Sequence, residues 1–420
     1  MNQVAAFMLI AWLALVALIG GMRWLSSEWG TARRKGLSPS YAAPVTSRVV
    51  SRVAEQISIW SFGGSDGAIR EPTLRRKIIY WGDPCVDTTF YALHALRKCE
   101  ELAKSVRARA FLEAKRDAIA VFLAGSFDRR EGAFRLTKGN WPTVYSQACV
   151  LQAFRLLSPD YSIDIPLYQL QMALSDEQAQ LTKQFVLRCR HPQGGLGERP
   201  GWDRSWADCN AGYHSFMWNT RPDAGAQAEL LTGAKAFARA SWIAKDGGFS
   251  DTLDGEAASC ATAFALFSLY DLAGRDTTVL KPYWDGALGF FKRCKVDGGF
   301  SWQPNEKPTI VHTRLVVGSL CQVLAPKDGR ESVQAFIEDV VNPQEVIGYA
   351  SRLLGGDGGG GFIEGSPPNI YATRAALHTL ALVQRTVPSV KIDNVDWNRT
   401  EDFIFSLYDE SSGGFRGYPK

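Results

Sequence analysis

The feature that most constrains the fold of this chain is a short glycine-rich turn that recurs six times. Each turn ends in a large apolar residue, and the six copies span Glu131–Phe134, Gln193–Leu196, Asp246–Phe249, Asp297–Phe300, Gly359–Phe362 and Ser412–Phe415. Successive apolar positions lie 62, 53, 51, 62 and 53 residues apart. Spacing of this kind is typical of stacked supersecondary units that cannot bury their apolar faces alone.

Each unit is predicted to contain two helices, the second of which ends at the glycine-rich turn. Segments 87–96, 260–269, 311–320 and 371–380 align without gaps and are rich in small residues, while bulkier and more charged segments such as Tyr283–Cys294 precede the turns. Paired glycines suit the left-handed conformation at a helix C-terminus. Small residues favour an inner ring, and neither end carries an evident polar capping repeat. We therefore expect an all-α fold, a single closed α6–α6 toroid over residues 75–420.

The amino terminus differs from the repeats. Residues 1–22 carry no charge, and the apolar run from Val4 to Met22 is long enough to cross a bilayer. Arg23, Arg33, Arg34 and Lys35 follow it, which predicts a single-pass anchor with the toroid on the cytoplasmic side. A buried core helix is the alternative. Residues 23–74 are expected to form a juxtamembrane tether, with the bilayer as the chain's partner.

Composition agrees with an intracellular globular protein. The eight cysteines include no C-x-x-C pair, as expected of free thiols in a reducing compartment. With 47 basic and 43 acidic residues the net charge is only +4, and no basic stripe stands out, so we expect no nucleic-acid partner.

The repeats resemble the prenyltransferase and squalene-oxidase repeat, the α/α toroid of protein prenyltransferase β subunits and triterpene cyclases. The segment Asp83–Leu96 is similar to the Asp-x-Asp-Asp-Thr-Ala motif of class II cyclases, and in register Asp87 falls on the central catalytic acid. Cys85 and Thr88 replace the flanking acids. The resemblance implies that Asp87 protonates an alkene. The alternative is that Asp87 only caps the following helix.

Ring closure would bring the last repeat against the first. We expect Tyr371, Arg374 and His378 beside Asp87, with His94 two turns further along the same helix face. Aromatic residues gather in segment 201–219, where isoprenoid chemistry would use them to stabilise carbocations; they are Trp202, Trp206, Tyr213, Phe216 and Trp218. Core packing is the alternative role for these five side chains.

Three other activities suit the same fold. Zinc-dependent prenyl transfer would need Asp, Cys and His ligands; His312 matches the family's histidine, but Ser259 and Ala261 stand where Asp and Cys are expected. Asp208 and Cys209 are weaker metal candidates, so no cofactor is predicted, with zinc as the alternative. A carbohydrate-active (α/α)6 enzyme and a non-catalytic binding or scaffold protein also remain open.

The leading hypothesis is a membrane-anchored, terpene-cyclase-like toroid for proton-initiated cyclisation of an apolar polyisoprenoid. Related cyclases usually place their site between two helical barrels, and this chain has one. The resemblance therefore implies a homodimer or a partner subunit that completes the cavity.

Overall fold

The computed structural model describes residues 83–137, 140–158, 175–202, 224–253, 255–325 and 330–419, all within the compact unit formed by residues 81–420. No helix in these ranges is long and apolar enough to cross a membrane. The predicted anchor 1–22 and tether 23–74 lie outside the described residues, so both stay predictions.

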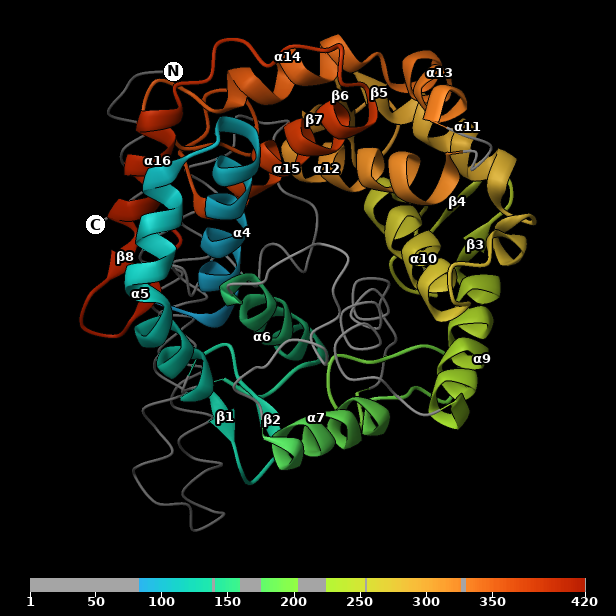
Figure 1. Cartoon of the computed structure of the whole chain (residues 1–420). Coiled ribbons are helices and arrows are strands. Elements are labelled where there is room, and N and C mark those ends of the chain that lie inside the picture. Colours follow the sequence, from blue (N-terminus) through green and yellow to red (C-terminus); the bar gives the residue numbers. More distant parts are fainter. Residues whose placement is uncertain are drawn as a thin grey trace, which may run out of the picture. The chain divides into compact units, whose positions relative to one another are not determined.

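Helices of two kinds make up this unit (Figure 1). The first kind forms an inner layer: α4 (Val86–Ala103), α6 (Val144–Leu157), α10 (Ser259–Leu272), α12 (Ile310–Ser319) and α15 (Ile370–Thr386). The second kind lies outside it: α5 (Val106–Ala124), α7 (Asp176–Arg188), α9 (Ala224–Ser241), α11 (Trp284–Cys294), α13 (Arg330–Val341), α14 (Pro343–Leu353) and α16 (Trp397–Ser406). A π-helical turn, Leu320–Leu324, extends α12, and a 3-10 turn, Thr277–Leu280, precedes α11.

Residue composition explains the two layers. Thirteen of the 17 residues of α15 are buried, against four of the 19 in α5. A helix that is small and apolar nearly all round can be covered on every side, whereas an amphipathic helix needs one wet face. The predicted inner and outer rings are therefore confirmed for the described helices.

The ring closes between the last and first repeats. Helix α4 packs between α15 and α6, and α15 packs between α12 and α4, although α4 and α15 lie almost 300 residues apart in the chain. At the junction the Cys85 amide donates to the Phe415 carbonyl at 3.3 Å, and the Phe415 amide donates to Thr89 Oγ1 at 3.0 Å. These contacts confirm the predicted closed toroid.

Short antiparallel strands flank four of the glycine turns. They pair as β1 (Phe127–Asp128) with β2 (Ala133–Phe134), β3 (Trp242–Ile243) with β4 (Gly248–Phe249), β5 (Lys295–Val296) with β6 (Gly299–Ser301), and β8 (Tyr408–Asp409) with β9 (Gly414–Phe415). A further strand, β7 (Pro308–Thr309), adds to β6. Phe127 is paired with Phe134, Trp242 with Phe249, Lys295 with Phe300 and Tyr408 with Phe415.

A threonine hydroxyl holds a glycine turn in place in four of the five described inner helices. Thr262, Thr313 and Thr373 each accept a turn amide 13 residues earlier, at 2.9, 2.8 and 2.7 Å, while donating to the carbonyl four residues back. Thr89 plays this part at the closing junction, and the Gln147 side chain replaces threonine in α6. The aligned threonines are therefore structural, because a buried turn amide needs an acceptor.

This pattern corrects one sequence alignment. Thr373 bonds the Gly360 amide, so Gly360 takes the place that Phe249, Phe300 and Phe415 have in other turns. Phe362, aligned with those residues from its Gly-Gly-Phe sequence, lies two positions later, where its carbonyl accepts the Ile310 amide. Extra glycines in segment 355–361 produced the misalignment.

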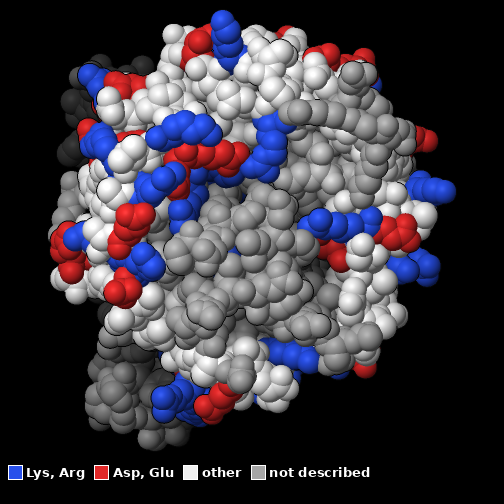
Figure 2. Space-filling view, in the orientation of Figure 1, with Lys and Arg blue, Asp and Glu red and all other residues white. Residues whose placement is uncertain are grey.

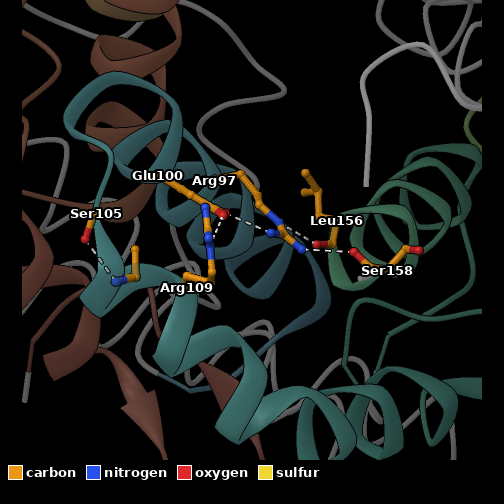
Figure 3. Close-up of polar contacts among 7 residues, drawn as sticks. Arg97, Glu100, Ser105, Arg109, Leu156 and Ser158 are labelled. Carbon is orange, nitrogen blue, oxygen red and sulfur yellow. Dashed lines mark hydrogen bonds and ion pairs between the residues drawn. The ribbon is translucent and has the colours of Figure 1, made fainter. Parts of the chain in front are cut away.

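Hydrogen bonds and ion pairs of arginine side chains connect α4 to α6 and to α5 (Figure 3). Arg97 donates through Nε to the Leu156 carbonyl at 2.9 Å and through Nη2 to the Ser158 carbonyl at 3.0 Å, which satisfies orphan carbonyls at the end of α6. Its Nη1 also pairs with Glu100, which accepts from Arg109 of α5. Figure 2 shows basic and acidic side chains interleaved over this part of the surface.

Candidate functional site

Asp87 is buried in the first turn of α4, with 2% of its surface exposed. Its Oδ1 accepts the Thr88 amide at 2.8 Å and the Cys85 thiol at 2.9 Å. Helix α4 begins at Val86 with Cys85 as N-cap, so the alternative in which Asp87 is the cap residue is wrong. A carboxylate in the first turn still interacts favourably with the helix dipole.

Two tyrosines, Tyr91 and Tyr145, lie near this carboxyl group, and a third, Tyr371, packs against Tyr91. The hydroxyls of Tyr91 and Tyr145 are hydrogen bonded, and the ring of Tyr91 stacks on that of Tyr371 with centroids 4.6 Å apart. Burial, first of all, and the charge of Asp87 among other contributions raise the pKa of both Tyr91 and Tyr145 well above the usual phenol value. Both phenols are therefore neutral at physiological pH.

Arg374 of α15 reaches across the closing junction to α4. It is 8% exposed, its guanidinium lies 4.7 Å from the ring centroid of Phe90 and 5.0 Å from that of Tyr91, and its Nε donates to His94 Nδ1 at 2.8 Å. Burial, with a contribution from Arg314, lowers the pKa of Arg374 to about 10, so the side chain remains charged at pH 7.

Two histidines continue the cluster. The rings of His94 and His378 meet edge to face with centroids 4.7 Å apart. Burial lowers the pKa of each well below the usual value, and nearby cations, including Arg374 and Arg314, lower it further. Both imidazoles are neutral at pH 7. Because a guanidinium can only donate, His94 accepts at Nδ1 and carries its proton on Nε2.

The structure brings Tyr371, Arg374, His378 and His94 together across the α4–α15 contact, through bonds and ring contacts with one another and with Tyr91. Their expected position beside Asp87 stays a prediction. The sequence argument did not single out Phe90, Tyr91, Tyr145 or Arg314. The sequence held a pattern that could have identified three of these residues. Phe90 and Tyr91 lie three and four residues after Asp87, on one helical face, and Arg314 aligns with Arg374 in the repeat register.

Of the five residues of the predicted aromatic wall, the structure describes Trp202. Trp202 lies under the guanidinium of Arg199, 4.7 Å from its ring centroid, and Arg199 also approaches the exposed Trp141. Arg199 and Trp202 both follow α7 in the chain, and Trp141 lies in the loop before α6. Trp206, Tyr213, Phe216 and Trp218 lie outside the described residues, so their part in a wall stays a prediction.

The metal candidates are likewise only partly described. His312 is buried in the first turn of α12, 5.5 Å from Trp302 between ring centroids, and its Nδ1 has no hydrogen-bond partner in the described structure. Burial lowers its pKa to about 3. No three His, Cys, Asp or Glu side chains converge as a metal site within the described ranges. Asp208 and Cys209 fall outside them.

Known proteins share this architecture. Solved structures that match include a D-mannose isomerase (11% identity, 73% of this chain and 89% of that chain, TM-score 0.51). Others are the Candida albicans protein geranylgeranyltransferase-I complexed with GGPP (16%, 71% and 84%, 0.49) and a type II terpene cyclase from Scytonema (14%, 72% and 88%, 0.47). At such identities the likeness concerns the fold alone.

Sequence comparison is more specific about the family. A search of curated proteins finds no match. A family model described as the prenyltransferase alpha-alpha toroid domain matches residues 37–216 and 321–420, two thirds of the chain. The toroid observed here is the fold that this description names. The chain belongs to the prenyltransferase alpha-alpha toroid domain family.

Proposed function

We propose that the toroid acts on an isoprenoid at the centre of its ring and that Asp87 starts a cyclisation by protonating an alkene. The observation that carries this proposal is the position of Asp87, which is buried in the inner layer near Tyr91 of α4 and Tyr145 of α6, with Tyr371 of α15 stacked on Tyr91. An acid for this step must be kept away from bulk water, where its proton would be lost.

The step is a proton transfer to carbon. The carboxyl O–H bond breaks, the alkene π electrons form the new C–H bond, and the positive charge appears on the more substituted carbon. Aromatic faces stabilise such a charge. Arg374 already lies over Phe90 and Tyr91, so we expect the carbocation to form against the other aromatic side chains, Tyr145 and Tyr371. Loss of a proton from the cyclised cation ends the reaction.

Asp87 must regain a proton after each turnover. The phenols of Tyr91 and Tyr145 are hydrogen bonded to each other, and burial raises the pKa of both, so neither can stay ionised. We propose that they pass a proton from water to Asp87 as a relay, in which each hydroxyl gives up one proton as it takes up another.

The test is Asp87→Asn, measured by mass spectrometry of products from purified protein incubated with squalene and with geranylgeranyl diphosphate. We expect product formation to fall by about 10²–10⁴-fold, the usual contribution of a general acid, with an unchanged melting temperature. Asp285→Asn is the matched control, because Asp285 is also an acid in a helix first turn but is exposed. Product formation by Asp87→Asn at the wild-type rate would reject the acid.

The membrane part of the hypothesis is proposed from the sequence. We propose that residues 1–22 hold the toroid at a bilayer, from which an apolar substrate partitions into the protein rather than into water. Removing residues 1–74 should move the protein from the membrane fraction to the supernatant. A second copy or a partner subunit completing the cavity would appear in size-exclusion chromatography with light scattering of the full chain.

A further inference from the structure

A pocket lies between two helices of the outer layer, α14 and α16 (Figure 1). Its volume is about 570 Å³, within the range of about 300–1,000 Å³ that small-molecule sites usually have. Three parts of the chain line it: one face of α14, the turn 354–356, and residues of segment 393–399, which leads into α16. No residue of the Asp87 site lines this pocket, so its role is separate from the proposed reaction.

Two glycines of the fifth turn leave room for the pocket. In the other five turns, the residue after the position paired across the hairpin has a side chain; these residues are Asp128, His191, Ile243, Val296 and Asp409. Leu354 pairs with Gly360, so Gly355 holds that place here, and Gly356 follows it. A Cβ on either glycine would meet no atom within 4 Å, and neither has positive φ. Backbone packing therefore does not require glycine at these positions, and the missing side chains open the pocket.

The floor of the pocket, defined as its buried lining residues Ile347, Ser351 and Leu354, combines apolar surface with one hydroxyl. Ser351 is 7% exposed, and its Oγ has no hydrogen-bond partner in the described structure. The buried hydroxyls of Ser241 and Thr379, in contrast, each donate to the carbonyl four residues back at 2.8 Å. Because an unsatisfied buried hydroxyl is costly, a polar ligand group that bonds Ser351 would be stabilised.

Four charged side chains line the pocket, two basic and two acidic: Arg352, Arg399, Asp393 and Asp396. One pair is already engaged. Arg399 Nε lies 3.4 Å from Asp396 Oδ2, and Arg399 Nη1 donates to the Gly356 carbonyl at 2.6 Å. These contacts connect α16 to the turn after α14 and hold the pocket wall in place.

The other two charges have no such partners. Arg352 and Asp393 are exposed and form no hydrogen bond or ion pair within the described ranges. The guanidinium of Arg352 lies over Gly348, with Nη1 3.6 Å from the position of a Cβ there, and Gly348 also lines the pocket. The pocket therefore offers one cation from α14 and one anion from the segment before α16.

We infer that this pocket binds a small zwitterion, a molecule with both an ammonium group and an oxyanion. Arg352 and the Ser351 hydroxyl donate to the oxyanion, Asp393 accepts from the ammonium group, and apolar parts of the ligand cover Ile347 and Leu354. A guanidinium fork matches a carboxylate or phosphate group, and an ammonium group has three donors for a carboxylate. A ligand with one charge alone would be repelled by the pocket residues of the same sign.

A free amino acid and the head group of an ethanolamine phospholipid both have this chemistry. Isothermal titration calorimetry on the full chain in detergent tests it with two zwitterions, leucine and glycerophosphoethanolamine. Leucinamide carries only the ammonium group, and N-acetylleucine carries only the carboxylate. We expect at least one zwitterion to bind roughly tenfold more tightly than leucinamide and N-acetylleucine, as for one added charge-assisted hydrogen bond. The tighter of the two zwitterions identifies the source of the ligand.

Single substitutions separate the two charges. Arg352→Gln should weaken the zwitterion and N-acetylleucine by roughly tenfold and spare leucinamide, whereas Asp393→Asn should weaken the zwitterion and leucinamide and spare N-acetylleucine. Arg239→Gln is the matched control for the cation, because Arg239 is also an exposed arginine in the last turn of an outer helix, α9. Asp117→Asn, at an exposed position of α5, is the control for the anion. Both controls should bind like the wild type.

Two further variants separate binding from folding. Gly355→Leu places a side chain in the pocket without a clash at its Cβ, so it should abolish binding and leave the melting temperature unchanged. Ser351→Ala removes a buried hydroxyl that has no partner in the described structure, so it should leave the melting temperature equal or higher. The same variant should weaken the zwitterion by roughly fivefold, as for one lost hydrogen bond.

The inference is overturned if neither zwitterion binds, or if both bind no more tightly than the probes with a single charge. Binding that survives Arg352→Gln, Asp393→Asn and Gly355→Leu at the wild-type affinity would overturn it as well. None of the probes has an isoprenoid chain, and no substituted residue belongs to the Asp87 site. Failure of this inference therefore leaves the proposed cyclisation standing, and failure of the cyclisation leaves the zwitterion site standing.

Discussion

Replacing Thr373 by valine tests whether the repeated threonine hydroxyl holds each glycine turn to the ring. Thr373 Oγ1 accepts the Gly360 amide at 2.7 Å and donates to the Asn369 carbonyl at 2.7 Å, and Thr373 and Gly360 are buried. Valine keeps the shape of the side chain but removes both bonds. The Asn369 carbonyl retains the Thr373 amide at 3.0 Å, whereas the Gly360 amide loses the side-chain acceptor described here.

The expected loss of stability follows from the Gly360 amide, which loses its side-chain acceptor while the Asn369 carbonyl keeps a donor. An unsatisfied buried donor costs about 1–3 kcal/mol, so Thr373→Val should lower the free energy of unfolding by this amount. The matched control is Thr379→Val on the same helix. Thr379 is also fully buried and donates to the carbonyl four residues back, at 2.8 Å, but it accepts no amide in the described structure. We expect its replacement to cost less than about 1 kcal/mol.

Urea unfolding followed by far-UV circular dichroism measures the difference. With a slope of about 3 kcal/mol per molar, the midpoint should fall by roughly 0.3–1 M for Thr373→Val and by less for Thr379→Val, with equal slopes. Equal midpoints for the two variants would refute the reasoning, because the turn amide would then contribute nothing beyond the back-bond that both threonines make.

Three further outcomes follow from particular residues. Thr89→Val should be as destabilising as Thr373→Val in the same urea measurement, because it removes the acceptor of the Phe415 amide across the closing junction; a neutral result would show that closure does not depend on it. Gly413→Ala should cost about 1–3 kcal/mol more than Gly274→Ala, since both have positive φ but only the Gly413 Cβ would meet a backbone oxygen, that of Ala118, at 2.6 Å; equal costs in thermal unfolding would contradict this. His312 has its pKa lowered to about 3, so as pH falls from about 6.5 the unfolded chain binds a proton that the folded chain refuses, and stability should drop by up to about 5 kcal/mol by pH 3. His312→Phe should make the urea midpoint less dependent on pH in this window, and an unchanged dependence would show that His312 is not kept neutral.

Much of the fold could be predicted because each repeat is marked by short, contiguous sequence patterns. Small residues at 260–269, 311–320 and 371–380 mark helices that are covered on all sides, and the turn glycines adopt positive φ at Gly132, Gly247, Gly298 and Gly413. The misplaced turn at 359–362 shows the limit of this reasoning. Six glycines within segment 355–361 offer several equally good registers, and only the bond from Gly360 to Thr373 selects one.

The candidate site was predicted less completely, because its contacts join residues far apart in the chain. Arg374 and His94 are 280 residues apart, and their bond follows from closure of the ring. Tyr145 was missed because α6 lacks the threonine that aligns the other inner helices and uses Gln147 instead. Arg314 was missed because its environment, in which Nε is buried without a hydrogen-bond partner in the described structure, follows from the packing of α12 and not from local sequence.

The sequence by itself determined that this chain forms helix pairs and where most of them turn, because periodicity and small residues act over one or two helical turns. Closure of the ring was predicted from six repeats without polar capping units, and it is seen in the contacts of α4 with α15. Only the tertiary structure decided which polar groups of α4, α6, α12 and α15 meet and which lack a hydrogen-bond partner in the described structure. Those properties depend on distances and burial across the closed ring, which no local pattern encodes.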